Sequence, residues 1–218
     1  MQGYTKSNVH ALHMQEERKT YYLIKRVFDI CASLAALIVL SPLFIIVALA
    51  IIIESPGSAI YAQQRVGFKG KMFKIYKFRS MCDKAHDQVD QLKELNERDG
   101  PVFKITNDPR ITKVGKIIRK TCIDELPQLL NVLKGEMSIV GPRPPLASEV
   151  EEYSVHDMQR LSVTPGLTCY WQINKGEETT FAQWVEMDVE YIKNQSIFTD
   201  ISIIILTFKV VLLVRGDN

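Results

Sequence analysis

RKTCIDELPQLLNVLKGEMSIVGPRP, residues 119–144 of a 218-residue chain, places an acidic pair where a short helix is predicted to begin. The pair is Asp124 and Glu125. Leucines recur at helical spacing behind it, and Gly135 is positioned to end the helix. The most informative segment of the chain is therefore predicted to be a short helix that opens on two carboxylates.

Cations flank this acidic pair on both sides. Arg119 and Lys120 precede it, and Arg143 follows it between two prolines. A helix N-terminus and nearby cations attract phosphate, while carboxylates supply a nucleophile or magnesium ligands. The pattern predicts phosphoryl chemistry on an anionic substrate. The alternative is that Asp124 is only a helix cap and Glu125 only a first-turn acid.

Composition indicates one domain with enough apolar residues for a core, because 46% of the chain is hydrophobic. The net charge of +2 hides two basic clusters. Residues 65–80 hold six Lys or Arg and no acid, and residues 110–120 hold five more. Such clusters suit nucleic acid, anionic lipid or phosphorylated substrates. The four cysteines form no CxxC pair, which argues against a zinc site or a disulfide framework.

Residues 30–53 form an uncharged apolar run that is long enough to cross a bilayer. Ser41 and Pro42 lie in its middle, where proline is expected to kink the helix. Basic residues flank the run on both sides, and such residues favour the cytoplasmic face. We therefore expect a re-entrant hairpin that enters and leaves on the same side. The alternative is a kinked helix that spans the membrane.

The chain is predicted to have three parts and an α-rich α+β fold with a few short strands. They are a polar N-terminal segment (1–20), a re-entrant membrane helix broken at Ser41-Pro42 (21–54) and a cytoplasmic, membrane-associated catalytic domain (55–218). Apolar residues 197–214 are expected to form an interfacial or core-packed helix. Strands are expected at 60–64 and 72–78, and helices at 83–98, from Asp108-Pro109 onward, at 149–160 and at 180–193.

Six blocks of sequence occur together: KRVFDI (25–30), Ser41-Pro42, YKFRSM (76–81), NDPRITKVGKIIRKT (107–121), IDELPQLLNVLKGEMSIVGPRP (123–144) and PGLT (165–168). In this order they resemble the bacterial sugar transferases, the monotopic polyprenyl-phosphate phosphoglycosyl transferases, in their short form. The resemblance implies a small α-rich catalytic domain carried on a re-entrant membrane helix and interfacial amphipathic helices. It also implies a location at the cytoplasmic face of the bacterial inner membrane.

The resemblance implies transfer of a sugar 1-phosphate from a nucleotide diphosphate sugar, expected to be a UDP-sugar, to polyprenyl (undecaprenyl) phosphate. The products are a polyprenyl-diphosphate sugar and UMP, and the reaction initiates synthesis of a surface glycan. Asp124 matches the family nucleophile, which forms a covalent aspartyl-phosphosugar intermediate. Glu125 matches its partner acid, and the two carboxylates are the expected ligands of Mg²⁺.

The cations that match the family are expected to bind phosphate. Arg119 and Arg143 are the favoured contacts, because a planar guanidinium can bind two oxygens at once. Lys77 and Arg79 are weaker candidates for substrate phosphate. Their alternative is binding of lipid headgroups at the membrane interface.

Two further acids, Asp188 and Asp200, match acidic positions in the family's C-terminal helices and are expected as supporting acids. The alternative for both is structural capping or salt bridging. The chain departs from the family pattern at residues 169–171, where Cys-Tyr-Trp replaces the usual sequence after the PGLT turn. It also carries Cys122 where the family commonly has serine.

Expected partners are the nucleotide diphosphate sugar, polyprenyl phosphate, inner-membrane lipids and downstream glycosyltransferases, with no nucleic acid.

Two alternative functions fit the sequence less well. A DNA-binding module is disfavoured by the membrane segment and by the acids that begin the second helix of residues 111–133. A non-catalytic membrane scaffold of a glycan assembly complex is disfavoured by the presence of both Asp124 and Glu125. The sequence leaves the sugar and the oligomeric state open.

Overall fold

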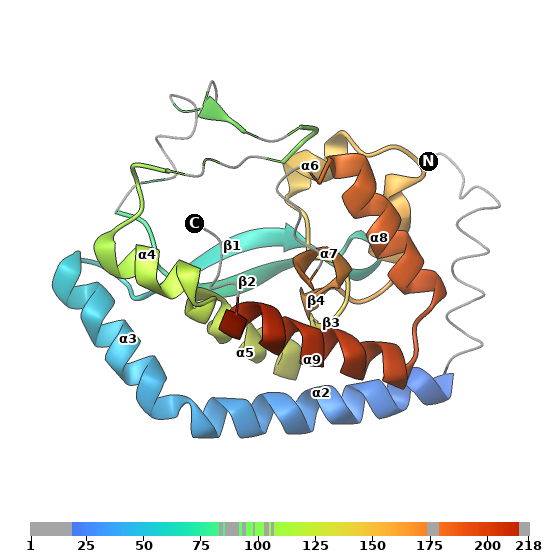
Figure 1. Ribbon diagram of the computed structural model, residues 1–218, viewed down its shortest axis with the longest axis horizontal. Coiled ribbons are helices and arrows are strands. Elements are labelled where there is room, and N and C mark those ends of the chain that lie inside the picture. The colour runs from blue at the N-terminus through green and yellow to red at the C-terminus, as the bar shows by residue number, and fades with distance from the viewer. Residues whose placement is uncertain are drawn as a thin grey trace.

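The computed structural model describes residues 19–82, 85, 92, 95–97, 99–102, 105, 107–173 and 179–213. Within these residues the chain is helix-rich with a few short strands, which confirms the expected fold class at this level. Figure 1 shows a long bent arm along one side of a mixed body. The arm consists of α2 (Lys19–Val39) and α3 (Ser41–Glu54). The predicted polar segment 1–20 lies almost entirely outside the described residues.

The arm bends by 61° where α2 gives way to α3. Pro42 has no amide hydrogen to donate to the carbonyl of Ile38, and the Ser41 hydroxyl donates to that carbonyl instead, at 2.8 Å. The break therefore lies at the predicted residues. No single helix among the described residues is long and apolar enough to cross a membrane, whereas the bent pair together meets that criterion.

A two-stranded antiparallel hairpin lies at the centre of the body (Figure 1). Its strands are β1 (Ile60–Val66) and β2 (Met72–Phe78), as the sequence predicts. Inward-facing Phe73 and Ile75 alternate with exposed residues along β2, as expected for a sheet with one buried face. They pack against Val132 and Met137, so the hairpin rests on the segment that carries the acidic pair.

The helix that precedes the acidic pair starts later than predicted. Asp108 does not open a helix, because its carboxylate forms a buried ion pair with Arg110 at 2.5 Å. Helix α4 (Lys113–Lys120) begins immediately after its N-cap residue Thr112, whose hydroxyl accepts the amide hydrogen of Gly115. The carboxylate of Glu54, at the end of α3, accepts two more amide hydrogens of the first turn. This contact joins the arm directly to the helix that leads to the acids.

The acidic pair lies in a 3-10 turn, η4 (Ile123–Gln128), rather than in the first turn of an α-helix. The α-helix α5 (Leu129–Lys134) follows, and Gly135 ends it in the left-handed conformation, with φ 81°. Buried Asn131 fixes α5 to β2, since its side-chain amide pairs with the backbone of Lys74 and Tyr76. The 3-10 turn is thus held between two anchored helices.

The second half of the chain contains a short parallel strand pair that the sequence did not predict. Strands β3 (Ser138–Val140) and β4 (Gly166–Thr168) pair across the middle of the body. The remaining elements are α6 (Ala147–Glu151), η5 (Asp157–Ser162), α7 (Tyr170–Ile173), α8 (Phe181–Lys193) and α9 (Ile197–Leu213).

The predicted helix over 149–160 is wrong, because α6 ends at Glu151 and a separate 3-10 turn begins at Asp157. Ser154 and Asp157 cap one another reciprocally, since each side chain accepts the other's amide hydrogen. This cap begins the separate 3-10 turn. The helices predicted at 180–193 and 197–214 correspond to α8 and α9. The helix predicted over 83–98 falls largely outside the described residues.

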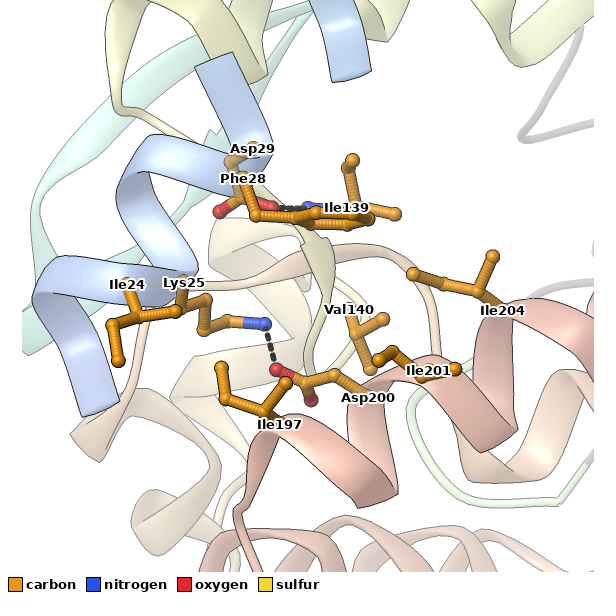
Figure 2. Close-up of a pocket in the computed structure, with 10 residues that line it drawn as sticks. All are labelled: Ile24, Lys25, Phe28, Asp29, Ile139, Val140, Ile197, Asp200, Ile201 and Ile204. Carbon is orange, nitrogen blue, oxygen red and sulfur yellow. Dashed lines mark hydrogen bonds and ion pairs between the residues drawn. The ribbon is translucent and has the colours of Figure 1, made fainter. Parts of the chain in front are cut away.

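Helix α9 lies along α2, and charged contacts join them (Figure 1). Figure 2 shows Lys25 of α2 reaching Asp200 of α9 within a crevice that is lined mostly by apolar side chains, where their charged atoms are 2.8 Å apart. Tyr21 and Tyr191 also donate to the Asp200 carboxylate. Asp29 accepts the amide hydrogen of Ile139 in β3. These contacts fix both ends of the chain's described part against the body.

The outer surfaces of the arm and of α9 expose many large apolar side chains. On α2 and α3 they include Leu23, Val27, Leu34, Ile38, Ile45, Ile46, Leu49 and Ile53, and on α9 they include Phe198, Ile201, Ile205 and Phe208. An apolar surface of this extent is characteristic of a contact with a membrane or another protein.

Candidate active site

Asp124 and Glu125 form the centre of the candidate site. The backbone reaches them through Cys122, which adopts the left-handed conformation with φ 55°. This conformation costs a non-glycine residue roughly 1–2 kcal/mol and persists where the surroundings enforce it. Asp124 is only 9% exposed, whereas Glu125 is partly exposed. The turn therefore buries one carboxylate and leaves its neighbour accessible.

The burial of Asp124 changes its protonation. Loss of hydration raises the pKa of Asp124 to about 6, and the neighbouring Glu125 adds to this effect. Lys77 and Arg119 oppose it, because each places a positive charge near the carboxylate. Asp124 is thus a buried acid between cations, ionised at neutral pH and protonated in mild acid. A perturbed carboxyl of this kind is typical of a catalytic group.

Lys77 reaches the pair from β2. Its ammonium group lies 2.6 Å from the Glu125 carboxylate, and both side chains are about one-fifth exposed. Because strand residues alternate, Lys77 points away from the face that carries Phe78 and toward the 3-10 turn. The hairpin thus supplies one of the cations that surround the acids.

A cavity opens beside the acidic pair. Its wall brings together residues of the hairpin, the 3-10 turn, the proline-rich loop (residues 141–145), β4 and the start of α7: Arg65, Ile75, Lys77, Glu125, Gln128, Arg143, Pro144, Gly166, Leu167, Cys169 and Gln172. Three of these residues are cations and one is a carboxylate. The lining is therefore suited to an anionic ligand that also carries groups able to hydrogen-bond to the side-chain amides of Gln128 and Gln172.

Close contact between β3 and β4 places Arg143 on this wall. The chain crosses itself at Gly141 and Gly166, where a side chain on Gly166 would lie 2.0 Å from the Gly141 amide nitrogen. Their backbones exchange hydrogen bonds with Thr168 and Pro142 across the crossing. Only glycine permits this approach, so the two motifs that contain these glycines meet at the cavity.

Comparison with known proteins identifies the family. Residues 20–214 match the family model described as bacterial sugar transferase. The chain belongs to the bacterial sugar transferase family. It is 45% identical, over 93% of its length, to the galactosyl transferase CpsE of Streptococcus agalactiae. It is 39% identical, over 89% of its length, to the exopolysaccharide production protein ExoY of Rhizobium meliloti. A third similar protein is the UDP-glucose:undecaprenyl-phosphate glucose-1-phosphate transferase of Escherichia coli, at 43% identity over 85% of the chain.

The relatives differ in length. The chain spans 88% of ExoY but only 45% of CpsE and 39% of the Escherichia coli protein. In each comparison the shared region covers 85% or more of this bacterial sugar transferase.

This bacterial sugar transferase brings together most of the residues singled out from its sequence. Lys77 pairs with Glu125, Arg119 lies near enough to Asp124 to lower its pKa, and Arg143 shares the cavity wall with Glu125. Arg79 lies elsewhere, since its guanidinium donates to the carbonyls of Ser55 and Pro56 behind α3. The structure therefore assigns Arg79 a contact with the end of the arm.

Asp188 and Asp200 also lie away from the cavity. Asp188 is fully buried and accepts a hydrogen bond from Arg160 at 2.7 Å. Asp200 is paired with Lys25. These contacts favour the salt-bridging alternative for both acids in the transferase.

Two cavity residues were missed by the sequence analysis. Arg65 belongs to a basic cluster whose members look alike in sequence, and Gln128 lies in the motif without a charge to mark it. Both are buried. Arginine is rarely buried, so the burial of Arg65 marks it as unusual. Its burial depends on how the hairpin packs, and the sequence alone does not show that packing.

The acidic pair fits a magnesium ion bound together with substrate. Among the described residues, no three His, Cys, Asp or Glu side chains gather as a metal cage would require. Mg²⁺ commonly uses only one or two carboxylates and takes its remaining ligands from phosphates and water. Asp124 and Glu125 are adjacent and one of them is accessible, so they satisfy that requirement.

Proposed function

We propose that this bacterial sugar transferase moves a sugar 1-phosphate from a UDP-sugar to undecaprenyl phosphate, at the cytoplasmic face of the bacterial inner membrane. The main support is the buried carboxylate of Asp124, whose pKa the positive charges of Lys77 and Arg119 lower against the effect of burial. The names of relatives agree with it, including an undecaprenyl-phosphate galactose phosphotransferase of Salmonella typhimurium that is 44% identical. A polyprenyl-diphosphate sugar of this kind is the substrate that downstream glycosyltransferases extend.

The reaction is proposed to occur in two displacements at phosphorus. A carboxylate oxygen of Asp124 attacks the β-phosphorus of the donor, the bond from that phosphorus to the bridging oxygen breaks, and UMP leaves with the electron pair. A phosphate oxygen of the lipid then attacks the aspartyl-bound phosphorus. The bond to Asp124 breaks, and the carboxylate is regenerated while the new diphosphate bond forms.

Cations contribute most to this proposal, because a carboxylate must approach an anionic diphosphate. Arg119, Lys77 and Arg143 supply positive charge around Asp124 and the cavity. Mg²⁺ held by Asp124 and Glu125 would neutralise further charge on the diphosphate. Burial keeps the nucleophile poorly hydrated, so fewer water molecules must be displaced before attack.

Release of UMP tests this function. Purified full-length protein should release UMP from one member of a panel of UDP-glucose, UDP-galactose and N-acetylated UDP-hexosamines when undecaprenyl phosphate is present. The scaffold alternative predicts no UMP from any donor. Undecaprenyl-diphosphate sugar, detected by mass spectrometry, identifies the product, and the donor that supports UMP release identifies the sugar.

The activity should depend on the ionisation of Asp124. Because the attacking form is the carboxylate and its pKa is about 6, log kcat/KM is expected to fall by about one unit per pH unit below pH 6. The free energy of unfolding changes with pH in the opposite direction to kcat/KM. A raised carboxyl pKa stabilises the fold below the unfolded pKa, and this contribution is lost as the pH rises through about 6. A kcat/KM profile that stays flat down to pH 5 would contradict Asp124 as the nucleophile.

The bent arm is proposed to be re-entrant, so that both of its ends lie on the cytoplasmic side. The 61° bend, the exposed apolar surface and the basic flanks support this topology. In a background without native cysteines, Lys19→Cys and Lys69→Cys should both be protected from an impermeant maleimide in intact cells. Labelling of one position alone would establish a spanning helix. Pro42→Ala should shift part of the population to that state, because it restores the missing backbone donor.

A further inference from the structure

Arg65, near the end of β1, is a buried cation on the wall of the active-site cavity. Its side chain is 7% exposed. One terminal nitrogen donates to the carbonyl of Pro144 at 3.2 Å, and the other donates to the side-chain oxygen of Gln63 at 2.8 Å. Both acceptors are neutral. The Nε atom is buried and has no hydrogen-bond partner within the described residues. The guanidinium charge is thus left without an ion-pair partner in the part of the chain that the structure describes.

Arg143 lines the same cavity with a second positive charge. Its guanidinium lies 6.0 Å from the centre of the Trp171 ring, a contact that orients it without cancelling its charge. Burial and the nearby Arg143 lower the pKa of Arg65 to about 10, although the charges of Glu149 and Glu125 act in the opposite direction. A buried charge without a partner is unfavourable, and a like charge beside it adds to the cost. A bound anion between the two guanidinium groups would reduce both the cost of burying the charge of Arg65 and its repulsion by Arg143.

The cations of the site divide into two groups. Lys77 and Arg119 act on Asp124, because both lower its pKa, and Lys77 also pairs with Glu125. Arg65 and Arg143 are the remaining cations of the cavity wall. The proposed reaction needs more than one phosphate position, since a phosphoryl group is transferred at Asp124 while a second phosphate stays attached to the nucleotide or the lipid. The second group of cations is available for that phosphate.

We propose that Arg65 and Arg143 together form a subsite for a phosphate monoester dianion. The inference rests on the proposed function, in which the departing UMP and the entering polyprenyl phosphate are both phosphate monoesters. Two planar guanidinium groups can direct several parallel N–H groups at one such dianion. Arg65 is then a substrate-binding residue, and its bond to Pro144 ties it to the loop that carries Arg143.

Two binding measurements on full-length protein in nanodiscs test the subsite. The first is the Kd for UMP, and the second is the KM for undecaprenyl phosphate. Arg65→Gln should raise the value for at least one of them about 10- to 100-fold, as expected when a charge-assisted hydrogen bond is lost. Lys74→Gln, which removes the same charge from an exposed position on β2, should change either value less than about twofold. A change in both values means that both monoesters use the subsite, and a change in one names its occupant.

Further variants separate binding from folding. Arg65→Lys keeps the charge without the planar fork, so its Kd or KM should fall between those of wild type and Arg65→Gln. If the two arginines hold one anion, combining Arg65→Gln with Arg143→Gln should weaken binding less than the product of the single effects. Unchanged Kd and KM in a folded Arg65 variant, with only a lower melting temperature, would overturn the subsite. If Arg65→Gln does not fold, Arg65→Lys decides by the same criterion.

The outcomes for the subsite and for the activity are distinguishable. Wild-type protein that releases no UMP from any donor, yet binds UMP in an Arg65-dependent way, would reject the activity and retain the subsite. Wild-type turnover combined with Arg65-independent binding of both monoesters would retain the activity and reject the subsite.

Discussion

Asp124→Asn should fold normally and lose roughly 10⁴- to 10⁶-fold in kcat, the range seen when a nucleophile is removed from an enzyme that works through a covalent intermediate. The amide nearly preserves the shape of the side chain but cannot attack phosphorus. The substitution also removes a buried negative charge whose pKa is raised by burial, so the fold should not be weakened at neutral pH. UMP release measures the loss directly.

Intact-mass analysis then identifies the chemical step. Wild-type protein incubated with its UDP-sugar, but without lipid phosphate, should gain the mass of one phosphosugar, and Asp124→Asn should not. Glu151→Gln, at an exposed acid on α6, is the matched control and should behave as wild type. Near-native turnover by Asp124→Asn would remove this residue from the role of nucleophile. A persistent adduct would place the nucleophile elsewhere.

Asp188→Asn should destabilise the fold by about 3–5 kcal/mol, because it leaves Arg160 buried without its partner charge. Asp188 is 0% exposed and lies 2.7 Å from the Arg160 guanidinium. Arg160 also lies against the ring of Tyr153, which cannot replace a carboxylate. Equilibrium unfolding in detergent measures the change in free energy.

The control for this prediction comes from the same helix. The Glu186 carboxylate lies 2.8 Å from the His156 ring at an exposed position, so Glu186→Gln should change stability by less than about 1 kcal/mol. The folded fraction of Asp188→Asn should keep the wild-type KM, because the ion pair lies away from the cavity. A selective rise in KM with unchanged stability would instead make Asp188 a supporting acid of the site.

Elements with strong local signals were predictable from the sequence. The hairpin followed from two short strand patterns around a glycine-containing turn, and α8 followed from its amphipathic pattern. The bend at Ser41-Pro42 followed from the lost proline donor. In each case the physical cause lies within a few residues, so no knowledge of distant contacts was needed.

Features that depend on distant contacts could not be predicted in this way. Strands β3 and β4 are three residues each and pair in parallel across a long connection, so neither has a recognisable pattern of its own. The late start of α4 depends on Glu54, which belongs to the preceding arm. The sequence placed Asp124 and Glu125 together but could not show that only Asp124 is buried. For the same reason the sequence did not single out Arg65, whose position on the cavity wall depends on its contact with Pro144 of the proline-rich loop.

The contact between Lys25 and Asp200 has a consequence for the order in which the chain assembles. The two residues are 175 positions apart, and each buries a charge that the other neutralises. During synthesis at about 5–20 residues per second, Lys25 emerges roughly 9–35 s before its partner exists. The arm can fold during that interval, but the end of the arm that carries Lys25 cannot be fixed to the body through Asp200 until α9 has been synthesised. Helix α9 therefore fixes the arm in place only after most of the described residues have been synthesised.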